Sequence, residues 1–295
     1  MNKTLFFITI AMRRMAQAWI ALIALSATTS SALPAEPAAI VFGVFPRWNA
    51  QITVRDFTPL ATLLSQELGR PVRIETDKDF DSFMRRVYAR EFDIVHLNQL
   101  QYLHAREAAN YRAIAKMCDN PACTIKAIIV TRREAKLTKV SDLKGKTVAF
   151  GDPSAMVSYV LAKSLLLESA LQPSQYKTVF TKNPPNALLA VYNGEADAAG
   201  VSLSVFQRPE IRQRIDIHQL RTLAESRPIP HLPIAVRSDM DAQLARRLQR
   251  ILTGLTRRQD GREALRKIGI ERFEAADDNQ YAIIRALMEE ETGAH

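Results

Sequence analysis

The feature that most constrains this chain is a repeated alternation between strand-like and helix-like segments. Apolar runs of strand length, such as Ala39–Val44, are followed by stretches with apolar residues on one helical face, such as Asp56–Leu68. Strand patterns that alternate with helical patterns predict βαβ units, in which a mainly parallel sheet is covered by helices. The sequence therefore predicts the α/β class.

The alternation comes in two sets, separated by the polar stretch Arg132–Ser141. The first set predicts strands over 39–44, 72–75, 92–97, 112–116 and 125–131. The second predicts strands over 146–150, 177–180, 196–201 and 219–224, and a further strand follows over 232–236. The pattern of the remaining residues predicts helices over 241–255, 262–268 and 277–290. Two sets of strands imply two sheets, two lobes and a cleft between them.

The first 32 residues have the pattern of a secretory signal peptide. Arg13 and Arg14 precede an apolar run, and small residues end at Ala32 as in a cleavage site. The apolar run is too short for a spanning helix, so an uncleaved anchor is the weaker alternative. The translated start could be Met1, Met12 or Met15. We therefore expect export to the periplasm and a mature chain that begins near residue 33.

Composition limits the classes of partner. The 295 residues carry a net charge of +9, which suits small anions or a negatively charged surface. The chain lacks the interleaved aromatic and basic residues that bind single-stranded nucleic acid, so we expect no nucleic-acid partner. Metalloprotease, P-loop, dinucleotide and nucleophile-elbow motifs are absent from the sequence, so we expect a protein that is not an enzyme and has no cofactor.

Several short motifs, in order, carry a resemblance to a known family. They are Phe45–Asn49 after the first strand, Phe57–Leu60, Phe92–Leu97, Ser141–Lys146, Gly151–Ser154, Asn186–Leu188 and Gly194–Ala198. This set resembles the phosphonate, phosphite and phosphate substrate-binding proteins of ABC transporters, which have the type II periplasmic-binding-protein fold. The resemblance covers nearly all of residues 39–288.

The resemblance implies a two-lobed protein that captures a small ligand between its lobes and delivers it to an ABC permease. The first lobe is expected over 33–135 plus 228–295 and the second over 136–227, with crossing segments at Glu134–Ser141 and Ser226–Pro230. A single continuous domain is the alternative. A second use of the same fold is to present the ligand, for example an oxyanion or arsenite, to a membrane histidine kinase. We expect a monomer in either case.

A helix that begins near Ser154 is the expected anion site of the second lobe. The N–H groups of Ser154, Ala155 and Met156 and the positive end of the helix dipole would face the cleft. The family has a Ser-Thr-Ser run here, whereas this chain has Ala155–Val157, with no hydroxyl. Since unpaired buried acceptors cost about 1–3 kcal/mol each, a ligand with a single anionic group suits the site better than a phosphonate dianion. Asn186 and Ser202 are the other ligand residues expected in this lobe.

Four residues of the first lobe are expected at the same cleft. Arg47 would pair with an anion, Trp48 would stack on a planar or methylated group, and His96 and Asn98 follow a strand. Each has a structural alternative: a solvated loop charge for Arg47, a cover over the core for Trp48 and a hydrogen-bonded core histidine for His96. The sequence leaves these alternatives open.

Cys118 and Cys123 are expected to form a disulfide. They flank an Asn-Pro loop in a chain predicted to reach an oxidising compartment. A metal site would need further Cys or His residues nearby in the sequence, and none is expected. A thiol sensor is a third possibility.

The arginines of the C-terminal segment predict a basic helical face. The series comprises Arg246, Arg247, Arg250, Arg257, Arg258, Arg262 and Arg266. Such a face is either solvated or docks on an anionic membrane or an acidic partner.

Overall fold

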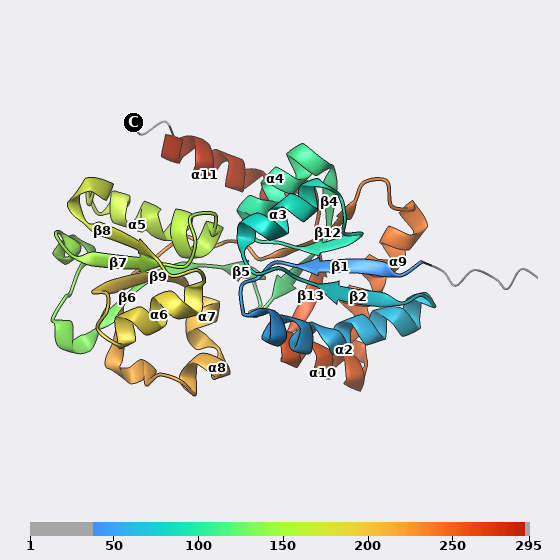
Figure 1. The fold of residues 1–295 in the computed structure, drawn as a ribbon, viewed down its shortest axis with the longest axis horizontal. Coiled ribbons are helices and arrows are strands. Elements are labelled where there is room, and N and C mark those ends of the chain that lie inside the picture. The colour runs from blue at the N-terminus through green and yellow to red at the C-terminus, as the bar shows by residue number, and fades with distance from the viewer. Residues whose placement is uncertain (1–37, 293–295) are drawn as a thin grey trace, which may run out of the picture. The chain divides into compact units, whose positions relative to one another are not determined.

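The computed structural model describes residues 38–292, so the expected signal peptide lies outside the described residues. The chain builds one six-stranded and one five-stranded sheet, each flanked by helices (Figure 1). We call the six-stranded sheet with its helices the first lobe, and the five-stranded sheet with its helices the second lobe. The predicted α/β class and two-sheet organisation are confirmed.

The first lobe takes strands from both ends of the described chain. Its sheet has the order β13-β4-β12-β3-β1-β2. The strands are β1 (Ile40–Val44), β2 (Val72–Glu75), β3 (Ile94–His96), β4 (Tyr111–Cys118), β12 (Pro233–Arg237) and β13 (Arg272–Ala275). Its helices are α2 (Ala50–Leu68), α3 (Phe80–Tyr88), α4 (Gln99–Ala109), α9 (Ala242–Gly254), α10 (Gln259–Ile268) and α11 (Ala282–Thr292). Strand β13 lies in a segment for which the sequence predicted only helices.

The second lobe contains the sheet β10-β6-β9-β7-β8. Its strands are β6 (Ala127–Arg132), β7 (Thr147–Phe150), β8 (Lys177–Phe180), β9 (Ala198–Ser202) and β10 (Leu220–Glu225). Its helices are α5 (Ala162–Glu168), α6 (Pro184–Tyr192), α7 (Leu203–Gln207) and α8 (Pro209–Arg212). A π-helical turn, Met156–Leu161, leads into α5.

Parallel pairing is confined to part of each sheet. It joins β1 to β2 and β3 in the first lobe, and β7 to β8 and β9 in the second. The strands next to the passage between the sheets pair antiparallel: β4 with β12 in the first lobe and β6 with β10 in the second. The reason is that the chain leaves each sheet and returns to it in the opposite direction. β12 with β3 and β6 with β9 are also antiparallel. Both sheets are therefore mixed, whereas the alternation alone had predicted mainly parallel ones.

The chain crosses between the sheets through two short strands that pair with each other. β5 (Thr124–Ile125) carries it outward, β11 (Ile229–Pro230) carries it back, and the pair is antiparallel. The return lies within the expected segment Ser226–Pro230. The outward passage precedes β6, which already belongs to the second sheet, whereas we had expected it at Glu134–Ser141. An apolar run such as 125–131 indicates a buried strand but does not indicate which sheet the strand joins.

Side-chain caps fix the ends of the helices nearest the passage between the lobes. Asn49 accepts a hydrogen bond from Ile52 N at the start of α2, and Asn98 forms a capping box with Gln101 at the start of α4. Both caps follow strands of the first sheet. They place the loops after β1 and β3 at the edge that faces the second lobe.

Candidate ligand-binding site

A cavity of about 40 Å³ lies between the two lobes. Its first-lobe lining consists of Phe45, Arg47, Phe80, Asn98 and Leu232. Its second-lobe lining consists of Ala155, Met156, Val157, Ser158, Pro184, Ser202 and Val205. Ile125 of the crossing strand β5 completes the wall. Most of these side chains are apolar, so the few polar groups determine which ligand atoms the cavity can accept.

Arg47 is the charged residue of this lining. It lies on the loop after β1, where its backbone N–H donates to Phe45 O at 2.8 Å and its guanidinium lies 6.0 Å from the ring centre of Phe45. Within residues 38–292 its side chain has no hydrogen bond and no ion pair. Burial and the nearby Arg208 lower the pKa of Arg47 to about 9, against the opposing effect of Asp119 and Glu210. Arg47 is thus a half-buried cation without a counter-ion in direct contact.

His96 lies beside Arg47, although it does not line the cavity. Its Nδ1 donates to Pro233 O at 3.1 Å, and its ring packs edge-on against Phe45 with 5.0 Å between ring centres. Burial, the Arg47 charge and His231 lower the pKa of His96 to about 3, against the hydrogen bond to Pro233 O, so the imidazole is neutral near pH 7. Its buried Nε2 has no hydrogen-bond partner in the described chain. The placement fits the structural alternative for this histidine.

Trp48 of the first lobe and Arg208 of the second lobe each contact the opposite lobe. Trp48 belongs to the first lobe and packs against the apolar cluster of the second sheet. Arg208 precedes α8 of the second lobe, and its Nη1 donates to Ile268 O, at the end of α10 of the first lobe, at 3.1 Å. The Arg208 guanidinium also lies 4.8 Å from the Trp48 ring centre. Trp48 is outside the cavity lining, so it joins the lobes rather than covering the cavity.

The second-lobe helix start differs from the expected arrangement. Two of the three N–H groups expected to face a ligand are already bonded: Ser154 N donates to Asp152 Oδ1 at 2.8 Å and Ala155 N to Asp152 O at 3.1 Å. The first helical hydrogen bonds run from Tyr159 N and Val160 N to Ala155 O. The N–H groups of 156–158 therefore precede the helical ladder. The expectation was wrong for the N–H groups of Ser154 and Ala155, because it did not include the turn that Asp152 closes, and it stays a prediction for the N–H group of Met156.

Ser158 is a lining residue that the sequence analysis did not identify. It is 3% exposed, and its hydroxyl has no side-chain hydrogen bond within the described residues. The π-helical turn widens the helix at this point, so the fourth residue after Ser154 still reaches the cavity. A search for hydroxyls through the whole first turn, rather than at 155–157 alone, would have found it.

The remaining predicted residues divide between the cavity and local structure. Asn98 lines the cavity and links the lobes, since its Nδ2 donates to Ser154 O at 3.1 Å. Ser202 also lines the cavity, and its hydroxyl caps α7 by accepting from Val205 N at 3.2 Å. Asn186 is exposed, outside the lining, and donates to Thr181 O. Ser154 is likewise outside the lining, where its hydroxyl donates to Asp152.

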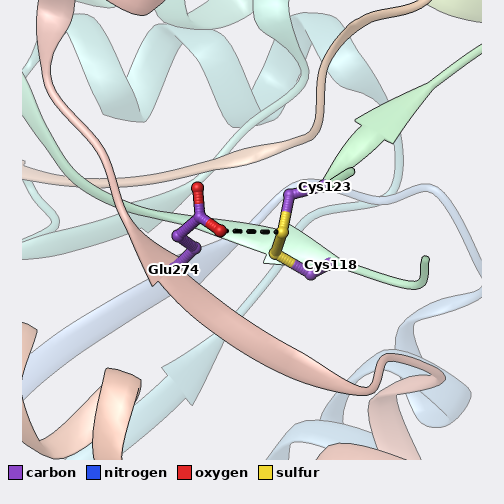
Figure 2. Close-up of side chains that lie close together, drawn as sticks. All are labelled: Cys118, Cys123 and Glu274. Atoms are coloured by element: carbon purple, nitrogen blue, oxygen red, sulfur yellow. Dashed lines mark hydrogen bonds between the residues drawn. A yellow bond between two sulfur atoms is a disulfide. The ribbon is translucent and has the colours of Figure 1, made fainter. Parts of the chain in front are cut away.

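Cys118 and Cys123 form the expected disulfide, which precedes the crossing strand β5. Figure 2 shows the Glu274 carboxylate directed at the Cys123 sulfur, 3.2 Å away. Arg272 Nη2 donates to the same sulfur at 3.0 Å. Because the two sulfurs are bonded to each other, neither is a free thiolate that could hold a metal ion beside Glu274.

The disulfide loop also brings a carboxylate close to Arg47. Asp119 Oδ2 lies 3.1 Å from His231 Nε2, and both residues line a small hollow together with Arg47 and Arg208. Burial alone would raise the pKa of Asp119, but His231, Asn120 and Arg47 lower it below its usual value. Asp119 is therefore ionised and directly engaged by His231, and it acts on Arg47 only from a distance.

The chain belongs to the family described as ABC transporter, phosphonate, periplasmic substrate-binding protein. The family model matches residues 42–281. This match confirms the resemblance found in the sequence and assigns the chain to a class of periplasmic solute-binding proteins. No helix in the described part of the chain is both long and apolar enough to cross a membrane.

Two solved structures have the same fold. One is a binding-protein component of an ABC phosphonate transporter from Pseudomonas aeruginosa, with a TM-score of 0.77, 20% identity and 85% of each chain covered. The other is PhnD1 from Prochlorococcus marinus in complex with methylphosphonate, with a TM-score of 0.78, 15% identity, and 86% of this chain and 98% of that chain covered. At these identities the likeness concerns the fold, which is two-lobed in both proteins.

A curated relative belongs to a signalling protein. The chain is 30% identical over 166 residues to the tetrathionate sensor histidine kinase TtrS of Salmonella typhimurium. The match covers 54% of this chain and 28% of the kinase. The similarity therefore concerns a part of that kinase.

Proposed function

We propose that this protein is exported to the periplasm, binds one small anionic solute between its two lobes as a monomer, and delivers it to an ABC-type permease. The observation that carries the proposal is Arg47, a half-buried cation in the inter-lobe cavity with no direct counter-ion. An anion that enters the cavity supplies that counter-ion. Family membership supports solute binding and the periplasm as the compartment.

The ligand contacts belong to the same proposal. Arg47 and Asn98 of the first lobe and Ala155, Met156 and Ser202 of the second would touch the solute, and Ser158 joins them. Trp48, His96, Ser154 and Asn186 would act through packing and local hydrogen bonds. The lobe boundaries in this proposal lie at β5 and β11, where the chain crosses between the sheets.

The predicted signal peptide supports export. We expect the mature protein to begin near Leu33 and to be released by osmotic shock from cells that express the full chain. N-terminal sequencing of the released protein tests this expectation. Exported protein that begins at Met1 would contradict it.

A thermal-shift screen tests solute binding. The mature protein is heated with oxyanions, including tetrathionate, and with phosphonates, sulfonates, organic acids and neutral solutes. A ligand at a hundredfold excess over its Kd stabilises the folded state by about 2.7 kcal/mol, which raises the melting temperature measurably. Every anionic hit should be lost in Arg47→Ala and kept in Arg266→Ala, whose side chain is exposed. If no solute raises the melting temperature, the proposal fails.

A second candidate function is presentation of the bound solute to a membrane histidine kinase. The similarity to part of a sensor kinase favours it. Deletion of the gene distinguishes the two functions when the solute found in the screen is supplied to cells. Loss of uptake of the labelled solute indicates transport, whereas normal uptake with a lost transcriptional response to the solute indicates sensing.

A further inference from the structure

The charge of the inter-lobe cavity limits the charge of its ligand, and this argument rests on the proposed solute-binding function. Arg47 is the one charged residue among the described residues that line the cavity. Arg208, the nearest other arginine, lies outside the lining, and Glu210 neutralises it at 3.1 and 3.2 Å. The cavity therefore offers one positive charge.

Apart from Arg47, the hydrogen-bond donors of the cavity lining are neutral groups. Asn98 donates one Nδ2 hydrogen to Ser154 O and accepts from Gln101 N. The Ser202 hydroxyl accepts from Val205 N and lies 3.3 Å from the Ser204 hydroxyl. Within the described residues, the donors left without a partner are the second Nδ2 hydrogen of Asn98, the Ser158 hydroxyl and the N–H groups of 156–158, and none of these groups carries a charge. A doubly charged ligand would bring a second negative charge for which the lining has no cation, and this is costly against largely apolar walls.

The volume and the walls limit the rest of the ligand. A space of about 40 Å³ holds roughly three or four water-sized groups. Phe45, Phe80, Met156, Val157 and Leu232 form apolar walls that suit a methyl or a short alkyl group. A long or strongly polar substituent does not fit between these walls while the lobes are in contact.

We infer that the physiological ligand is a compact monoanion, an acid group with a single charge on a short apolar substituent, and that this site selects against the dianionic form of a phosphonate. Arg47 sets the charge, Ser158 and the adjacent N–H groups bind the acid oxygens, and the apolar walls select the substituent.

An isosteric pair of ligands tests the inference. Methanesulfonate and methylphosphonate have nearly the same size and shape, but methanesulfonate stays singly charged, whereas methylphosphonate gains a second charge on passing through neutral pH. Calorimetry at pH 6.0 and pH 8.5 gives both Kd values, with propionate as a second monoanion. The ratio of the methylphosphonate Kd to the methanesulfonate Kd should rise by about tenfold at the higher pH, in step with the loss of the monoanion. Methanesulfonate itself serves as the control for any change in the protein.

A variant with one added donor strengthens the test. Val157→Thr places a hydroxyl on the cavity wall with little change of shape, and it should reduce the rise of that ratio between the two pH values. Val160→Thr is the matched control, because Val160 lies on the same turn, is equally buried and does not line the cavity. Its ratio should equal that of the parent protein.

Two kinds of result overturn the inference and are distinguishable from failure of the proposed function. Tighter binding of methylphosphonate at pH 8.5 than at pH 6.0, relative to methanesulfonate, shows that the site prefers the dianion. If no monoanion binds while a neutral or cationic solute from the screen does, the ligand class is wrong although solute binding stands. Failure of every solute in the screen removes both.

Discussion

Arg208 is expected to hold the two lobes together without touching the ligand. Its guanidinium leaves the second lobe and binds the carbonyl end of α10, where the helix dipole is negative. It also lies over the Trp48 ring and is 4.0 Å from Asp56 Oδ2, on α2. Glu210, its other partner, is in the same lobe and orients the side chain. Arg208→Ala therefore removes contacts between the lobes and leaves the cavity lining intact.

The size of the effect follows from the contacts that are lost. A hydrogen bond from a charged donor is worth about 1.5–3 kcal/mol, and a cation–π contact with an enclosed ring about 1–2 kcal/mol. Because the two share one side chain, we expect a combined loss of about 2–4 kcal/mol rather than their full sum. This loss shifts the equilibrium between touching and separated lobes by about 30- to 1,000-fold.

Fluorescence energy transfer between the lobes measures that shift. Dyes are attached through Arg85→Cys in α3 and Lys177→Cys in β8, since both native cysteines are in the disulfide. Arg208→Ala should lower the transfer efficiency. It should also weaken ligand binding in proportion to the fall in the fraction of molecules whose lobes touch. Arg212→Ala, an exposed arginine of α8, is the control. Unchanged transfer efficiency in Arg208→Ala would refute the reasoning.

Three further predictions concern the residues around this contact. Gly269 has a φ of +75°, and an added Cβ would lie 2.7 Å from Arg208 Nη1, so Gly269→Ala should lower both the unfolding free energy and the energy transfer. Cys118→Ala with Cys123→Ala should lower the unfolding free energy by about 2 kcal/mol, the chain-entropy value for so short a loop; a denaturation midpoint equal to that of the parent would contradict it. The His96 pKa of about 3 lies below that of an unfolded histidine, so acidification from about pH 6.5 to 3 should remove up to about 1.4 kcal/mol per pH unit. His96→Asn should flatten this pH profile in chemical denaturation, and identical profiles would count against the assignment.

The sequence predicted those features that depend on local pattern. Alternating periodicity identified two α/β sets, and the position of Asn98 after a strand placed it at the cleft, while its second role as the cap of α4 was not predicted. The sheet to which β6 belongs depends on pairing with β9 and β10, which are distant in sequence, so an apolar run could not indicate it. Strand β13 is short and has two exposed residues, so its only sequence signal was weak.

The candidate site shows the same division. Arg47 could be predicted as a charged residue at a strand end, but whether it had a partner depended on the direction of every neighbouring side chain. Ser158 was missed because a π-helical turn, which periodicity does not predict, brings it to the cavity. Asn186 matched a family motif, yet its amide bonds Thr181 O at the surface. A motif predicts a backbone position better than it predicts the direction of a side chain.

Arg47 and Arg208 have different roles in holding the lobes together and in binding the ligand. Arg208 has its counter-ion in Glu210, so its contacts with the first lobe favour touching lobes whether or not a ligand is bound. Arg47 has none, so it favours touching lobes only when an anion joins it to the N–H groups and hydroxyls of the second lobe. A ligand shifts the equilibrium between touching and separated lobes only by the difference in its affinity for these two states. An anion between Arg47 and Ser158 binds the touching state more tightly, because the two residues lie on opposite lobes. Strengthening the Arg208 contact should therefore raise the apparent affinity for the ligand only while a fraction of the free protein still has separated lobes. Once the lobes touch in all of the free protein, a stronger contact adds nothing to affinity and slows release of the ligand to the permease.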